Sequence, residues 1–138
     1  MTVRIGMTVA ALAIGVFAAG CGSKSGDAAK EQAAQQATPQ QAIAQVAKVR
    51  TGLDAALATY RAGDRAKASE QVGDAYLEHF ELVEPPLDRV DHGLRVKVEQ
   101  TIRQTLRDRM KAGAPTADVA RLVQRVDGLL DRVTATLQ

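Results

Sequence analysis

The sequence contains few of the residues that catalytic and nucleic-acid-binding sites most often use. Its 138 residues include no tryptophan, two tyrosines, two phenylalanines and a single cysteine, Cys21. A lone cysteine has no partner for an intramolecular disulfide, so such bridges do not stabilise the fold. With so few aromatic side chains, the platforms on which bases or sugars could stack are missing.

The usual catalytic motifs are also missing. The chain has only three serines, and it contains no Cys-x-x-Cys, no His-Glu-x-x-His and no phosphate-binding glycine loop. No pairing of a nucleophile with a base is discernible, so we expect that the protein is not an enzyme. The formal net charge is +2 for the whole chain and falls by one if Arg4 is removed with a signal peptide. A chain so nearly neutral predicts no general attraction to nucleic acid or anionic lipid, and no nucleic-acid partner is expected.

An export signal occupies the N-terminus. One arginine, Arg4, precedes an uncharged apolar run from Ile5 to Ala19, and Ala18, Ala19 and Gly20 then lead directly to Cys21. A basic start, an apolar stretch and a small-residue site are typical of a signal peptide. The cysteine after the small residues makes the segment resemble a bacterial lipoprotein signal, which implies that the Cys21 thiol carries a lipid and becomes the new N-terminus.

Two other interpretations of this segment are open. The run could be a transmembrane helix, although about 15 apolar residues is fewer than the roughly 20 that span a bilayer. Cys21 could also lie by chance beside an ordinary signal. Under the lipoprotein interpretation, residues 1–20 are the signal peptide, 21–37 a lipid-anchored flexible tether without large apolar side chains, and 38–138 one domain. We expect the protein in the cell envelope, outside the cytoplasm, attached to a membrane through lipid on Cys21.

The domain carries the spacing of amphipathic helices throughout. Apolar residues recur at steps of three and four from Ile43 to Tyr60, from Val72 to Val83, from Leu94 to Met110 and from Val119 to Leu137. Thr38 and Gln41 form a capping box for the first helix, while Asp64 and Thr116 are expected to cap the second and the fourth. The fold expected is all-α, an antiparallel four-helix bundle preceded by the signal peptide and tether.

Glycine and proline mark the connections between these helices. Gly63 predicts the first stop, and Gly113 with Pro115 predicts the break before the fourth helix. Pro85 and Pro86 are expected to end or kink the second helix, because neither ring nitrogen can donate a hydrogen bond. Residues 87–93 should then form a short turn or a single helical turn.

An acidic ladder is the most unusual feature of the second helix. Glu78, Glu81 and Glu84 lie three residues apart and fan across one side of the helix. Like charges so close repel one another unless they are compensated. Compensation could come from a bound metal ion or from arginines of the third helix, namely Arg95, Arg103, Arg107 and Arg109.

The ladder lies within a longer pattern. It reads Asp74-Ala75-Tyr76-Leu77-Glu78-His79-Phe80-Glu81-Leu82-Val83-Glu84, and Glu99, Arg103 and Leu106-Arg107 follow in the next helix. This pattern is similar to the extracytoplasmic helical domain of the oxidase-coupled high-affinity iron permease family, over about residues 65 to 135. The chain departs from that family because it has no multi-span membrane domain and no Arg-Glu-x-x-Glu permeation motif, so it cannot itself be a permease.

The resemblance implies a stand-alone relative that binds or delivers iron, or that docks on an iron permease or another envelope transporter. The metal ligands it implies are Glu78, His79, Glu81, Glu84 and Glu99, with Tyr76, Arg103 and Arg107 around them. Against this stands a metal-free network in which Arg103 and Arg107 neutralise the glutamates, with His79 as a packing residue. His92, between Asp88 and Asp91, could likewise be a weak surface metal site or part of a capped, solvated turn. The alternative function is therefore a metal-free envelope interaction or adaptor module.

Overall fold

A computed structural model describes Gln32 and residues 36–138, and in that part of the chain it is all-α. The signal peptide 1–20, Cys21 and most of the tether lie outside the described residues. The elements, in chain order, are α2 (Pro39–Arg61), α3 (Arg65–Ala75), the π-helical segment η1 (Tyr76–Phe80), α4 (Glu81–Asp88), α5 (His92–Gln100), the π-helical segment η2 (Thr101–Leu106), α6 (Arg107–Lys111) and α7 (Thr116–Leu137).

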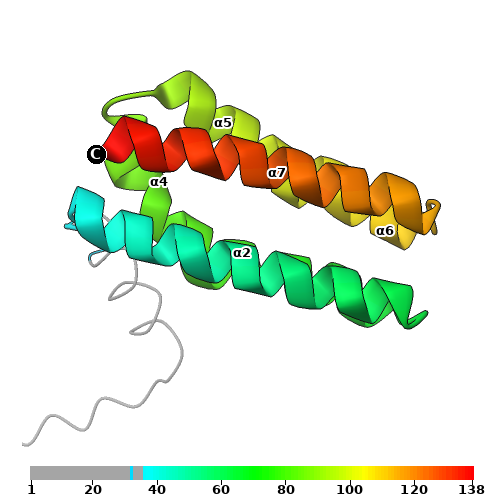
Figure 1. Cartoon of the computed structure of the whole chain (residues 1–138). Helices are drawn as coiled ribbons and strands as arrows, with labels where there is room; N and C mark the ends of the chain where they lie inside the picture. The colour runs from blue at the N-terminus through cyan, green and yellow to red at the C-terminus, as the bar shows by residue number, and fades with distance from the viewer. Residues whose placement is uncertain (1–31, 33–35) are drawn as a thin grey trace, which may run out of the picture.

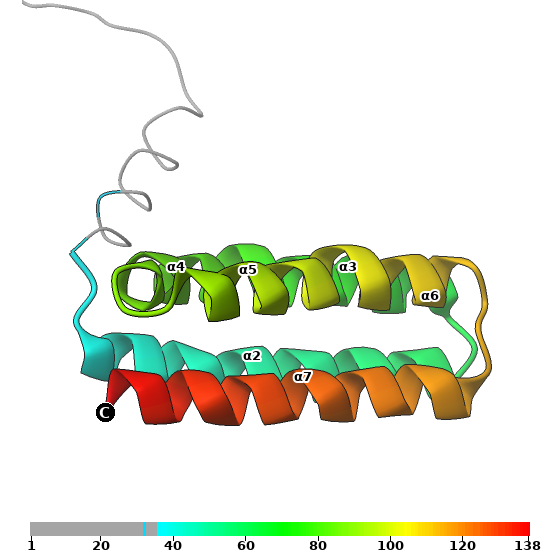
Figure 2. The ribbon, with the colours of Figure 1, turned by 90° about the horizontal axis from the view of Figure 1, so that it is seen from above.

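These elements form four antiparallel arms, and the predicted four-helix bundle is confirmed. The first arm is α2, the second runs from α3 through η1 to α4, the third runs from α5 through η2 to α6, and the fourth is α7. Figure 2 shows two layers, with α2 beside α7 in one and the second and third arms in the other. The described chain enters α2 at the end of the bundle where α7 finishes (Figure 1). Within residues 36–138, no helix is long and apolar enough to cross a membrane.

One hydrophobic core joins the four arms. Every arm contributes side chains that are fully buried, and the largest of these are Leu53, Phe80, Leu87, Ile102, Leu106, Met110 and Leu130. These residues belong to the stripes that the three- and four-residue spacing predicts, which is why burying one face of each helix assembles the bundle. All buried apolar residues of the described chain lie between Ala42 and Leu137.

The ends of the helices follow local chemistry at most positions. Thr38 and Gln41 form the predicted capping box, and the Asp64 side chain accepts a hydrogen bond from the Lys67 backbone N–H. Gly63 and Gly113 both adopt positive φ, +96° and +70°, in the two turns that follow α2 and α6. The prediction for Thr116 was wrong.

Pro115 occupies the capping position of α7, and Thr116 is the first helical residue without a side-chain cap bond. The fixed φ of proline lets the chain enter α7 from an extended conformation, with ψ of 138° at Pro115.

The proline pair kinks the second arm without ending it. Pro85 and Pro86 lie inside α4, which continues to Asp88, so the turn predicted over 87–93 is present but shorter, between Asp88 and His92. Val83, Pro86 and Leu87 are buried, and this burial offsets the hydrogen bonds that the proline rings cannot donate. In Figure 2, α4 is seen nearly end-on while α3 lies along the bundle, so the arm bends sharply.

A hydrogen bond between the turn regions supplies the first testable prediction. The hydroxyl of Tyr60, a residue 5% exposed, donates to the Ala114 carbonyl oxygen at 2.6 Å and ties the end of α2 to the turn before α7. Tyr60→Phe should lower the free energy of unfolding by about 1 kcal/mol and the melting temperature by about 5 °C, measured by circular dichroism. Thr136→Ala, at an exposed position, is the control and should change neither value. An unchanged Tyr60→Phe melting curve would contradict the prediction.

Candidate functional site

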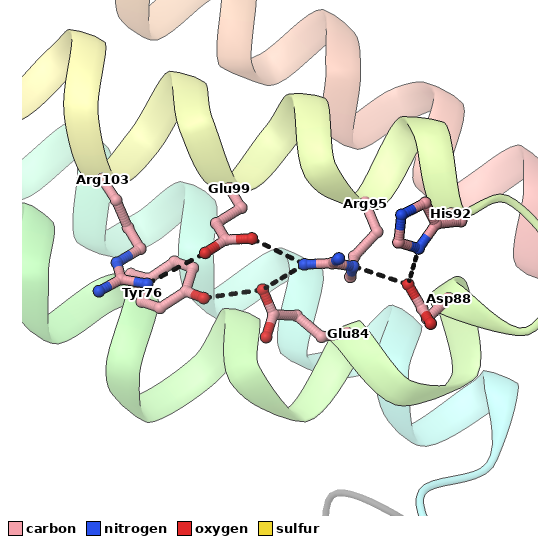
Figure 3. Close-up of polar contacts among 7 residues, drawn as sticks. All are labelled: Tyr76, Glu84, Asp88, His92, Arg95, Glu99 and Arg103. Carbon is pink, nitrogen blue, oxygen red and sulfur yellow. Dashed lines mark hydrogen bonds and ion pairs between the residues drawn. The ribbon is translucent and has the colours of Figure 1, made fainter.

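The polar cluster of the bundle lies between the second and third arms. Tyr76 of η1 and Glu84 of α4 face Arg95 and Glu99 of α5, and Arg103 of η2 closes the row (Figure 3). At 1.5 Å per residue, positions eight apart on a straight α-helix are separated by about 12 Å. Tyr76 and Glu84 are eight apart and yet in contact, because a long tyrosine side chain spans the bend at η1 and α4.

Carboxylates and arginines alternate along this row. The Tyr76 hydroxyl donates to Glu84 Oε1 at 2.7 Å, and Arg95 Nη1 lies 3.9 Å from the same oxygen. The same Arg95 nitrogen is 2.7 Å from Glu99 Oε2, and Arg103 Nη1 is 3.0 Å from Glu99 Oε1. Each Glu99 oxygen therefore accepts from a different guanidinium, and the Arg95 guanidinium lies between Glu84 and Glu99.

Tyr76 and Arg103 also stack. The guanidinium carbon of Arg103 is 4.9 Å from the centre of the Tyr76 ring, which is a cation–π distance. Arg103 thus contacts both the tyrosine that holds Glu84 and the carboxylate of Glu99. The row is one connected network joining η1 and α4 to α5 and η2.

Asp88 extends the network toward the turn before α5. Its Oδ1 accepts from Arg95 Nε at 2.7 Å and lies 2.7 Å from His92 Nδ1. Asp91 instead caps α5, because its side chain accepts from the Leu94 backbone N–H at 2.8 Å. The carboxylates of this turn are therefore used for capping and pairing.

The network shifts the pKa values of its acids in opposite directions. Burial raises the pKa of Glu84 above its ordinary value, and the hydrogen bond from Tyr76 opposes that rise only in part. The hydrogen bond to His92, followed by that from Arg95, lowers the pKa of Asp88. Burial, followed by the Glu84 hydrogen bond, raises the pKa of the Tyr76 hydroxyl. Tyr76 therefore acts as a hydrogen-bond donor that holds its proton.

The structure brings together only some of the residues proposed from the sequence as metal ligands. Glu84 and Glu99 belong to the network, whereas Glu78 is exposed and Glu81 is half-buried without a hydrogen bond or ion pair to a described residue. His79 turns toward α2, where its Nδ1 lies 3.1 Å from Gln45 Oε1. Among residues 32 and 36–138, no group of three or more His, Cys, Asp or Glu side chains is arranged to hold a metal ion. This geometry favours the metal-free network over the metal site.

Arg107, expected beside the glutamates, lies on another side of the third arm. Its guanidinium packs over Gly73 of α3, where an added Cβ would lie 3.3 Å from the guanidinium carbon. A hollow of about 360 Å³ opens here between α3 and α6, and Ser69, Glu70, Gly73, Asp74, Leu77, Arg107 and Lys111 line part of it. The absence of a side chain at Gly73 leaves the space that the arginine fills.

Arg95 was expected among the arginines that compensate the ladder, but neither Arg95 nor Asp88 was included in the proposed site. The spacing of Arg95, Glu99 and Arg103, four residues apart, is the helical ion-pair spacing and could have identified the alternation. The pairing of Asp88 with Arg95 had no such signal, because it crosses the turn between α4 and α5. The position of Asp88 relative to Arg95 depends on how Pro85 and Pro86 bend α4.

Comparison with known proteins identifies no relative of this chain. The chain matches no protein-family model, no curated protein and no solved structure. Membership of the iron permease family therefore stays a prediction.

Glu84→Gln tests the buried carboxyl through the pH dependence of stability. The folded-state pKa of Glu84 is raised, so the folded chain binds this proton more tightly than the unfolded chain. The free energy of unfolding should therefore fall as pH rises from the ordinary glutamate pKa, about 4.3, to the folded value. Glutamine is uncharged and still accepts from Tyr76, so the variant should lose this part of the slope.

The measurement is the urea midpoint at several pH values for both chains. Their difference isolates Glu84 from Asp127, whose pKa burial also raises, and from Asp88, whose lowered pKa acts in the opposite sense. Glu78→Gln, at an exposed glutamate of the same arm, is the matched control and should follow the parent curve. Parallel curves for the parent and Glu84→Gln would contradict the assignment.

Proposed function

We propose that this protein is a lipid-anchored protein of the cell envelope whose helical bundle is a metal-free interaction module that docks on a membrane transporter. The anchor is the Cys21 thiol, and the bundle acts outside the cytoplasm. The observation that carries the metal-free part of the proposal is the alternation of Arg95 and Arg103 with Glu84 and Glu99. Carboxylates already neutralised by guanidinium groups are poor ligands for a cation.

The proposed docking surface is an acidic strip on the outer side of the second arm, formed by Glu70, Asp74 and Glu78. These residues are four apart, all three are exposed, and none has a hydrogen bond or ion pair with a described residue. Glu70 and Asp74 line one hollow, while Asp74 and Glu78 line the next, so the three carboxylates succeed one another along the helix. Leu77, 47% exposed, supplies an apolar contact beside them.

Unpaired acids at this spacing weaken the helix on which they lie. Like charges four residues apart destabilise a helix by a few tenths of a kcal/mol per pair. A basic surface on a partner would reverse that effect and would also accelerate association. The strip therefore supports a partner with a cluster of lysine or arginine residues facing it.

The iron interpretation remains open to a direct test. We expect isothermal titration of the purified chain with ferrous or ferric ion to give no saturable heat, and Glu81→Ala with Glu84→Ala to give the same trace as the parent. Saturable binding that the double variant abolishes would overturn the metal-free proposal and restore the iron function that the resemblance implies. The circular dichroism spectrum of the variant should be compared with that of the parent, so that loss of fold is not taken for loss of a site.

Docking is tested by crosslinking in intact membranes, followed by purification and mass spectrometry. The parent chain should recover a multi-span transporter, and Asp74→Asn with Glu78→Gln should reduce its yield at least about fivefold, through loss of two interfacial charges. The control, Asp54→Asn with Asp108→Asn, removes the same charge from exposed positions outside the strip and should leave the yield unchanged. Equal yields from both variants, or no transporter with the parent, would refute docking through the strip.

A further inference from the structure

The end of the bundle farthest from the start of α2 is strongly basic. Five exposed cationic side chains lie in the helix ends that flank its two turns. They are here called the basic end: Arg61, Arg65, Lys67, Arg109 and Lys111. None of these side chains has a hydrogen bond or ion pair with any residue in the described part of the chain. By contrast Arg50, Arg95 and Arg103, elsewhere in the bundle, all contact carboxylates.

The two turns form one surface. Figures 1 and 2 place the turn after α2 and the turn before α7 at the same end, away from the point where the described chain enters the bundle. The Arg65 guanidinium lies against Gly113 of the other turn, and Ala66 lines the same hollow as Lys111. The five cations thus lie at one end of the bundle.

Local helix electrostatics explain only part of this cluster. Arg61, Arg109 and Lys111 are in the last turns of α2 and α6, where the helix dipole favours cations. Arg65 and Lys67 are in the first turn of α3, which has no acidic residue and where the dipole disfavours cations. Arg65 and Lys67 therefore stand where the helix dipole disfavours them, and no described residue pairs with their side chains. Such cations indicate an interaction with another molecule.

The carboxylates near these turns cancel only part of the charge, because Asp64, Glu70 and Asp108 offset three of the five cations and leave an excess of two. Asp64 uses its side chain to cap α3, and Asp118 pairs with Arg121. Asp108 is exposed in α6, and Glu70 belongs to the acidic strip on the flank of α3. The near-zero net charge of the chain therefore conceals a positive end.

We infer that the basic end binds the anionic headgroup surface of a phospholipid bilayer. Charges spread over two turns of the bundle match an extended anionic plane better than a small ligand. Stacking of nucleic-acid bases is not supported, because all the aromatic side chains in the described residues, Tyr60, Tyr76 and Phe80, are buried. The choice of a bilayer rests on the proposed function in one respect, the attachment of the N-terminus to a membrane.

Attachment would keep a bilayer at high local concentration near the domain. The sixteen residues between Cys21 and Thr38 can span at most about 55 Å. The 23 residues of α2 measure about 35 Å. The chain is therefore long enough for the basic end to reach the bilayer that holds the anchor. Each cation near an anionic surface should strengthen the contact about fivefold.

The experiment is lysine acetylation footprinting of the full chain on vesicles, read by mass spectrometry. Lys67 and Lys111 report on the basic end, while the exposed Lys48 of α2 and Lys97 of α5 are internal controls. On vesicles containing phosphatidylglycerol, acetylation of Lys67 and Lys111 should slow several-fold, and high salt should restore it. On phosphatidylcholine alone, all four lysines should react as they do in solution.

A charge variant that keeps all four reporters completes the test. Arg61→Gln with Arg65→Gln should weaken the contact with the bilayer by about 25-fold, whereas Arg125→Gln with Arg132→Gln removes the same charge from exposed positions of α7 and should not weaken it. The melting temperature should change little in the first variant, because losing the favourable Arg61 charge at the end of α2 and removing the unfavourable Arg65 charge at the start of α3 act in opposite directions.

Three outcomes would each overturn the inference. Lys67 and Lys111 could be protected on neutral vesicles, or the two arginine variants could lose protection equally. Duplex DNA could also protect these lysines where anionic vesicles do not. The acidic-strip variant Asp74→Asn with Glu78→Gln should keep the footprint, so failure of transporter docking is distinguishable from failure of bilayer binding. A chain that does not stay on neutral vesicles contradicts the proposed attachment. In that case, slower acetylation of Lys67 and Lys111 on vesicles containing phosphatidylglycerol still supports binding of the basic end to anionic lipid.

Discussion

The position of Arg95 between Glu84, Asp88 and Glu99 is the constraint on which the functional interpretation depends. Its guanidinium has three carboxylate neighbours on two arms, and the side chain is only 19% exposed. Without that cation, Glu84 and Glu99 would face one another partly out of water, and burial already raises the pKa of Glu84. Arg95 therefore converts a repulsive acidic site into the polar contact that joins α4 to α5. Because the network pairs Glu84 and Glu99 with Arg95, the acids that stay available for a partner are the unpaired ones of the acidic strip.

The bend of the second arm makes this contact possible. The π-helical segment η1 and the prolines of α4 turn the chain so that Glu84 approaches both the Tyr76 hydroxyl and the third arm. π-Helical turns are rare and often mark functional positions. Here the second one, η2, carries Arg103, which stacks on Tyr76 of the first. The two irregular segments thus meet through one cation–π contact, while Phe80 and Ile102 from the same segments are buried in the core.

Periodicity predicted the bundle well because burying an apolar face is a local property of each helix. The stripe from Leu94 to Met110 is buried as expected, and the capping box at Thr38 formed. Which side chains pair with one another was harder to predict, since the pairing depends on how the helices rotate about their axes and on the bend at Pro85. Arg107 shows this: four residues after Arg103 in sequence, it packs over Gly73 of α3 instead of joining the glutamates. The π-helical segments left no sequence signal that helix propensity could reveal.

The arrangement of unpaired charge also constrains how the domain could sit on a membrane. The acidic strip runs along α3, parallel to the bundle, and the basic end lies across its tip, with Glu70 and Lys111 lining the same hollow where the two surfaces meet. A bilayer under the basic end would leave the strip rising from the lipid surface, because the strip follows the helix axis. The partner best placed to contact such a strip is a protein embedded in the same membrane with a basic extracytoplasmic face. Bilayer binding and transporter docking are therefore geometrically compatible, and the first would orient the domain for the second.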